Sequence, residues 1–283
     1  MAAAMPILAA MTRILRLIPT LTALALCLSA LPAQARGTTQ EDVLAGDLLS
    51  GWQMQTGAHM AGIRLQLAPG WKTYWRSPGD AGIPPRFDWS GSENLKSVRV
   101  HWPSPTVFHT SGFKTIGYKG GVVLPVEVEA VDPTRPVVLR AAVELGVCRD
   151  ICMPAYLDLV VEVAAPGAPD DQIRAALKAR PESAGEAGVG QVSCTVDPIA
   201  DGLRITAEIA LPRQPGEETV AFETEDPRIW VAEAVASRTG NRLVAVTEMV
   251  GPSGQPFALD RSAMTLTVIS DKGAVEIRGC PAP

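Results

Sequence analysis

The chain has 283 residues, of which 47% are hydrophobic, 5% aromatic and 19% charged, and its formal net charge is −5. At roughly 100 to 200 residues per domain, this length suggests two domains. The acidic balance, without a long run of either sign, makes nucleic acid an unfavourable partner.

The first 35 residues are predicted to be a secretory signal. Arg13 and Arg16 precede an apolar stretch at 17–31, and Ala33-Gln34-Ala35 then forms an A-x-A cleavage site. The apolar stretch is shorter than the ~20 residues that a membrane span needs, so we expect cleavage after Ala35. The mature chain should then be periplasmic, in a Gram-negative cell, and should not itself span the membrane.

Alternating apolar and polar residues dominate the chain between Glu41 and Val163. The runs end at Gly, Pro, Asp or Ser, which is typical of half-buried strands. They cover residues 59–67, 95–102, 121–131, 137–147 and 157–163. An aromatic-rich segment at 69–80 interrupts them, and we expect its tryptophans to pack in the core.

A change of composition separates this region from a second one. Residues 164–169 are typical of a linker, 170–179 are predicted to form a short helix with an acidic start, and 181–190 are small and polar. Strand patterns then return at 191–196, 203–211, 219–224, 229–237, 242–250, 264–269 and 275–278. This spacing predicts two β-sandwiches.

Four cysteines remain after signal removal, and in an oxidising compartment an even number indicates disulfides. They are Cys148, Cys152, Cys194 and Cys280. Three pairings are possible, and the sequence does not choose among them. Cys148 with Cys152 is the local pairing. Cys194 with Cys280 would then close a loop of about 85 residues, a structural link worth ~4 kcal/mol in the chain-entropy model.

The Cys148/Cys152 pair lies in a tight connection between two predicted strands. Thiol exchange needs one cysteine to attack a partner disulfide and a second to resolve the mixed disulfide. Three intervening residues allow this if the backbone turns sharply enough to bring the Cα atoms within ~7 Å. Arg149 would stabilise a thiolate and Asp150 would oppose it. Two alternatives stay open: a structural disulfide, and a copper(I) site that adds Met153.

Several motifs in a fixed order give the chain a family resemblance. They are Gly70-Trp71-Lys72-Thr73-Tyr74-Trp75-Arg76, Gly79-Asp80-Ala81-Gly82-Ile83-Pro84, Phe87-Asp88-Trp89, Trp102-Pro103, Gly117-Tyr118, Leu124-Pro125-Val126 and the cysteine segment 146–154. With these motifs the chain resembles the periplasmic N-terminal domain of DsbD-type thiol:disulfide interchange proteins. The likeness is closest to the ScsB-like branch, which is associated with copper-sensitivity suppression.

The resemblance implies that the first region is an immunoglobulin-like sandwich, and together with the strand spacing it leads us to expect an all-β fold of two immunoglobulin-like sandwiches. We expect a redox domain at 36–165, after the signal at 1–35, then a linker with one helix at 166–190 and a second sandwich at 191–283. Residues 191–283 carry less of the likeness than the first region does.

The resemblance also implies roles for individual residues. Cys148 and Cys152 take the catalytic positions, with Cys152 forming mixed disulfides and Cys148 resolving them. The family shields its pair with an aromatic cap loop, which falls at 108–118 in this chain. The cap-loop candidates are Phe113 first, Phe108 second, and their neighbours His109 and Tyr118; ordinary core packing is the alternative for the two phenylalanines.

Two departures qualify the likeness. The cysteine spacing is shorter than the five intervening residues of the best-known members. Those members also continue into a membrane domain and a thioredoxin domain that this sequence does not contain. Electrons should therefore come from a separate membrane-embedded thiol reductase.

We predict a periplasmic protein-disulfide reductase that acts by thiol:disulfide interchange, without cofactor or metal. It would pass reducing equivalents from the membrane reductase to oxidised thioredoxin-fold partners. The alternative is a non-enzymatic module, either an adaptor with two structural disulfides or a copper(I)-binding accessory protein.

Overall fold

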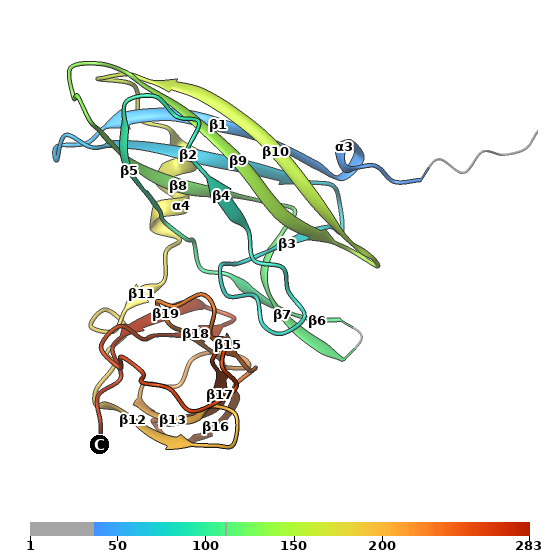
Figure 1. Ribbon diagram of the computed structural model, residues 1–283, viewed down its shortest axis with the longest axis vertical. Coiled ribbons are helices and arrows are strands. Elements are labelled where there is room, and N and C mark those ends of the chain that lie inside the picture. Colours follow the sequence, from blue (N-terminus) through green and yellow to red (C-terminus); the bar gives the residue numbers. More distant parts are fainter. Residues whose placement is uncertain (1–36, 111) are drawn as a thin grey trace, which may run out of the picture. The chain divides into compact units, whose positions relative to one another are not determined.

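The computed structural model describes residues 37–110 and 112–283, and strands dominate both ranges (Figure 1). The predicted signal at 1–35 lies outside the described residues. Within the described ranges, none of the helices has the length and apolar character that crossing a membrane requires.

Residues 40–163 build the first sandwich. Its elements are α3 (Gln40–Val43), β1 (Leu44–Gln53), β2 (His59–Leu67), β3 (Lys72–Tyr74), β4 (Arg86–Asp88), β5 (Leu95–Val100), β6 (Thr106–Thr110), β7 (Phe113–Lys119), β8 (Gly121–Ala130), β9 (Val137–Cys148) and β10 (Cys152–Val163). One sheet has the order β1-β2-β8-β5, and the other has the order β10-β9-β3-β7-β6 with β4 beside β9. The strand pairs in both sheets are antiparallel.

The core lies between these two sheets because alternate residues of each strand point inward. In β9 the inward positions are apolar and buried: Val137, Leu139, Ala141, Val143, Leu145 and Val147. Each such side chain contributes about 1.5–3 kcal/mol when fully buried, and less for alanine. The tryptophans behave as expected, since Trp71 and Trp75 are buried and Trp89 and Trp102 pack against the same core.

Strand β3 is short and lies between β9 and β7. All three of its residues are buried, although two carry polar side chains and the third is a tyrosine. Lys72 pairs with Cys148 of β9, and Thr73 pairs with Val147. The strand thus brings residues about 75 positions away in sequence beside the cysteine pair.

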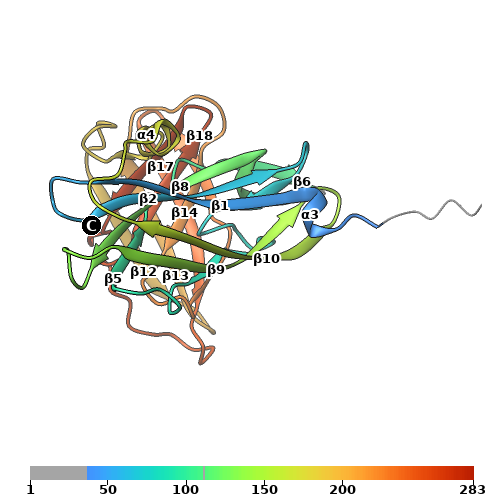
Figure 2. The same cartoon turned by 90° about the horizontal axis from the view of Figure 1, so that it is seen from above.

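The predicted cap loop is a β-hairpin. Strands β6 and β7 pair from Thr106↔Gly117 to Thr110↔Phe113. In both views this hairpin and the β9–β10 turn extend toward the same side of the first sandwich (Figures 1 and 2).

Helix α4 (Asp171–Lys178) follows the first sandwich and confirms the predicted helix to within one residue at each end. The Asp170 side chain caps it by accepting hydrogen bonds from the backbone N–H groups of Gln172 and Ile173. The buried Ile173 packs over Gly62 of β2, where a Cβ atom would lie only 3.0 Å from Ile173 Cγ1.

The second sandwich has its own hydrophobic core. Its strands are β11 (Glu182–Ser183), β12 (Val192–Pro198), β13 (Leu203–Ala210), β14 (Thr219–Glu223), β15 (Trp230–Val231), β16 (Val235–Thr239), β17 (Arg242–Val250), β18 (Thr265–Ser270) and β19 (Gly273–Arg278). One sheet is β11-β19-β18-β14, and the other is β12-β13-β17-β15 with β16 also on β17. Strand β11 pairs with β19, so this sandwich includes residues ahead of the expected start at 191.

Candidate active site

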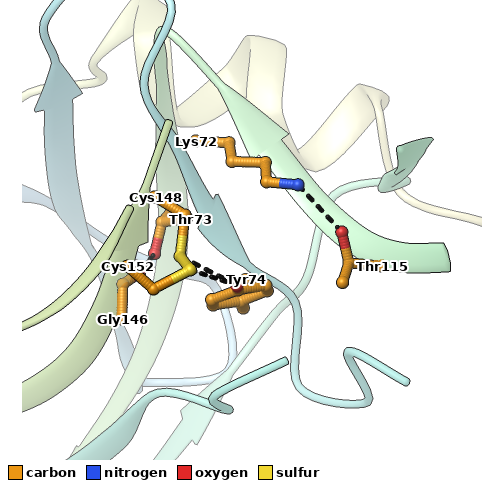
Figure 3. The surroundings of a disulfide bond; sticks show 7 residues. All are labelled: Lys72, Thr73, Tyr74, Thr115, Gly146, Cys148 and Cys152. Atoms are coloured by element: carbon orange, nitrogen blue, oxygen red, sulfur yellow. Dashed lines mark hydrogen bonds between the residues drawn. A yellow bond between two sulfur atoms is a disulfide. The ribbon is translucent and has the colours of Figure 1, made fainter. Parts of the chain in front are cut away.

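Cys148 and Cys152 form a disulfide at the end of the β9–β10 hairpin (Figure 3). The two residues are direct partners in the antiparallel register, and their Cα atoms are 4.1 Å apart. The chain reverses through Arg149, Asp150 and Ile151, where the Arg149 N–H donates to the Ile151 carbonyl. This is the sharp turn that the three-residue spacing required.

The two cysteines differ in exposure. Cys148 is buried, with 1% of its surface exposed, whereas Cys152 is an exposed residue. Cys152 is therefore the more solvent-accessible residue of the pair.

Tyr74 of β3 reaches both sulfur atoms. Its hydroxyl oxygen lies 2.8 Å from Cys148 Sγ and 3.4 Å from Cys152 Sγ (Figure 3). Because a disulfide sulfur carries no hydrogen, the hydroxyl is the donor in both contacts. Burial raises the pKa of Tyr74, so the group keeps its proton and remains a donor well into the alkaline range.

Gly146 makes room for the Tyr74 ring. A Cβ atom at Gly146 would lie 3.0 Å from Tyr74 Cε2 and 2.9 Å from Ile83 Cβ. The carbonyl oxygen of the same residue accepts a hydrogen bond of 2.9 Å from Thr73 Oγ1. Strand β3 is thus fixed against β9 at the position from which Tyr74 faces the sulfurs.

Lys72 is a buried cation on the strand next to the disulfide. Its Nζ donates to Thr115 Oγ1 at 3.0 Å and lies 5.2 Å from the centre of the Phe108 ring. Burial lowers the pKa of Lys72 because the protein solvates its ammonium group less well than water does.

Arg149 and Asp150 offset each other, as their opposed charges suggested. Arg149 Nε lies 2.9 Å from Asp150 Oδ2, and both side chains are largely exposed. The Arg149 guanidinium also lies 5.4 Å from the centre of the Trp71 ring.

The cap-loop candidates occupy different places in the hairpin. Phe108 lies under the Lys72 ammonium group, whereas Phe113 begins β7 and is 62% exposed. His109 lies on the outer strand, with Nε2 3.4 Å from Glu217 Oε2. Tyr118 is buried in the core and donates to the Pro103 carbonyl, and its place in the cap stays a prediction.

The remaining cysteines, Cys194 and Cys280, form the second disulfide. Both residues are fully buried in the core of the second sandwich. The surroundings of the Cys194–Cys280 disulfide therefore differ from those of the Cys148–Cys152 disulfide. They are consistent with the structural role that the sequence suggested for Cys194–Cys280.

Four residues at the site were not identified from sequence: Lys72, Tyr74, Thr115 and Gly146. All except Thr115 lie inside the motifs that carried the resemblance. Their roles depend on which strands pair, and Tyr74 and Cys148 are 74 residues apart. The local sequence offered no signal for this pairing beyond the i, i+2 spacing of Lys72 and Tyr74, which puts both side chains on one face of a strand.

The fold and the site together define a class: an all-β protein of two immunoglobulin-like sandwiches, with one buried disulfide and one disulfide in a strand turn that has an exposed member. Within the described ranges, no group of three or more His, Cys, Asp and Glu side chains is arranged to hold a metal ion.

The first sandwich coincides with a known family. Residues 40–163 match the family model described as thiol:disulfide interchange protein DsbD, N-terminal. The predicted resemblance to this family is confirmed over this range.

A solved structure extends the similarity in fold beyond that domain. It is described as the N-terminal periplasmic domain of ScsB from Proteus mirabilis. The TM-score is 0.63 at 24% sequence identity, and the match covers 87% of this chain and 96% of that chain. None of the curated proteins matches this chain.

Proposed function

We propose that this protein is a periplasmic thiol–disulfide exchange protein, in which the Cys148/Cys152 pair reduces disulfides of thioredoxin-fold partners. A separate membrane-embedded thiol reductase would restore the dithiol. The observation that carries the proposal is a disulfide with one buried and one exposed member, held in a DsbD N-terminal domain. The sequence signal at 1–35 and the fold shared with a periplasmic domain support the location.

The first step of the reaction uses Cys152. Its thiolate attacks one sulfur of the partner disulfide, the partner S–S bond breaks, and the released partner thiolate takes up a proton. The product is a mixed disulfide between Cys152 and the partner.

The second step uses Cys148. Its thiolate attacks Cys152 Sγ, the intermolecular S–S bond breaks, and the second partner sulfur leaves as a thiolate that is then protonated. Two electrons have passed to the partner, and the Cys148–Cys152 disulfide has formed again. The membrane reductase would reverse these steps by attacking the exposed Cys152.

Serine substitutions test these roles. Cys152→Ser should abolish exchange, because the accessible nucleophile is lost. Cys148→Ser should accumulate a mixed disulfide, because nothing resolves it. The measurement is non-reducing electrophoresis with mass mapping after the reduced protein is mixed with an oxidised thioredoxin-fold protein.

The same mapping supplies an internal control, since Cys194 and Cys280 should stay bonded throughout. A mixed disulfide that accumulates in Cys152→Ser instead would exchange the two roles. Unchanged exchange in both variants would refute the proposed function.

A further inference from the structure

We propose that Lys72 is a positioning residue that stabilises the thiolate of Cys148 whenever the disulfide opens. The inference rests on the proposed function. It adds one charged group, the Lys72 ammonium, to the two cysteines of the proposed exchange site. Cys148 becomes a thiolate when a partner attacks Cys152, and again before it resolves a mixed disulfide.

The register of the sheet places the two residues together. Lys72 and Cys148 are direct partners in the antiparallel pair of β3 and β9. Directly opposed residues project to the same face, with Cβ atoms about 4.5–5.5 Å apart. Both are buried, so water weakens the interaction of their charges much less than it would at the surface.

In the disulfide form, the β6–β7 hairpin holds the Lys72 ammonium group toward β7, on the other side of β3 from Cys148. Thr115 Oγ1 accepts the hydrogen bond of the lysine and the Phe108 ring faces its charge, and these two residues are themselves register partners. Figure 3 shows the Lys72 chain leaving β3 beside Cys148 and running to Thr115.

A thiolate at Cys148 would change the electrostatic environment of the Lys72 ammonium group. In the disulfide form the sulfur carries no charge, while the lysine bears the cost of burial described above. Opening the disulfide creates a negative charge on the adjacent strand. The ammonium then lowers the free energy of that thiolate, which makes Cys148 a better leaving group and an available nucleophile at lower pH.

Other charged or titratable groups face the same pair. Tyr74 donates to Cys148 from β3, and Arg149 and Asp150 form an ion pair in the turn. Lys119 of β7 is the register partner of Lys72 on its other side, but it is exposed. Lys119 is therefore a matched control, with the same charge and row in the sheet but with full hydration.

The test is an NMR titration of protein labelled at cysteine Cβ and lysine Cε, in which Cys148 is followed separately from the other cysteines. Lys72→Met keeps the length of the side chain and removes the charge. It should raise the pH at which Cys148 titrates by about one unit or more. Lys72→Arg should restore most of the shift, and Lys119→Met should leave the titration of Cys148 unchanged.

The wild-type protein gives a second readout that needs no folded variant. Coupling between two sites is reciprocal, so the Lys72 resonance should titrate at higher pH in the dithiol form than in the disulfide form. Identical Lys72 titrations in the two forms, or equal shifts in the two lysine variants, would overturn the inference. Those results in a protein that still exchanges disulfides would leave the proposed function intact.

Discussion

At the scale of single residues, the site contains one buried tyrosine hydroxyl beside the two cysteines. Tyr74 contacts both sulfurs, and it faces them because Gly146 leaves space for its ring. A neutral donor at this distance interacts more strongly with a thiolate than with a disulfide sulfur. The hydroxyl therefore favours the reduced form once Cys148 is ionised.

Tyr74→Phe should raise the pH at which Cys148 titrates by about one to two units, since a hydrogen bond to a charged group is worth roughly 1.5–3 kcal/mol. The effect should persist to high pH, because the raised pKa of Tyr74 keeps the hydroxyl protonated there. Cysteine Cβ NMR against pH measures it.

Tyr118→Phe is the matched control for this substitution. It removes a buried hydroxyl that donates to the Pro103 carbonyl. It should cost about 1 kcal/mol in unfolding experiments and leave the titration of Cys148 in place. A shift of similar size in both variants would mean that Tyr74 acts only through general stability.

At the scale of elements, the β6–β7 hairpin, which is the predicted cap, contacts Lys72 on β3, the strand beside the cysteine pair. The Phe108 ring contacts Lys72, which pairs with Cys148, whereas Phe113 projects from the turn into solvent. We therefore now favour Phe108 over Phe113 as the shielding residue.

Phe108→Ala should increase the rate at which the dithiol reacts with a small disulfide such as oxidised glutathione severalfold, because the shield is lost. Phe113→Ala should leave that rate unchanged and slow only the reaction with a protein partner. Stopped-flow kinetics with both kinds of oxidant distinguish the two. The reverse pattern would return the cap to Phe113, as the sequence first suggested.

Sequence patterns identified the regular strands and missed the irregular ones. Strands β2 and β17 were predicted with the bounds that the structure shows. Strand β17 has one buried face and therefore alternates along its whole length. Strand β3 has no alternation, since its three residues are all buried. Strand β1 has a break in register between Leu49 and Trp52, which obscures its period.

The same reasoning explains which residues of the candidate site could be predicted from the sequence. Two cysteines three residues apart are visible in any sequence, and their local pairing is confirmed. Lys72 and Tyr74 become neighbours of that pair only through the β3–β9 register, which no local pattern specifies. The cap interpretation of Tyr118 stays a prediction, and its side chain packs in the core.

At the scale of the whole molecule, the protein combines two disulfides in different surroundings. Cys194 and Cys280 are fully buried, and the loop between them spans most of the second sandwich. The pair at Cys148 and Cys152 closes a short turn with an exposed member. Exposure and loop length therefore distinguish the disulfide that we propose for exchange from the one that we propose for stability.

Equilibration in glutathione buffers should reduce Cys148–Cys152 and leave Cys194–Cys280 oxidised. Structural disulfides have reduction potentials below about −300 mV, whereas the reduction potentials of exchange pairs lie within the range found for thiol–disulfide exchange proteins. Mass-tagged alkylation with peptide mapping reports the two pairs separately.

Two other outcomes would each favour one of the alternative functions, a structural adaptor or a copper(I)-binding accessory protein. Resistance of both pairs to reduction would indicate a structural adaptor. Tight copper(I) binding by the reduced protein, together with failure to exchange, would favour an accessory protein that handles this metal.

The register of the β9–β10 hairpin affects how a partner would distinguish the reduced, dithiol form of the protein from the oxidised, disulfide form. Twelve consecutive residue pairs join these strands, and the disulfide links only the last of them. Opening that bond leaves the other eleven pairs to hold the backbone in place. In the proposed cycle the oxidised and reduced proteins would then present almost the same outline, and a partner would have to sense the state from the charge and reactivity of two sulfur atoms.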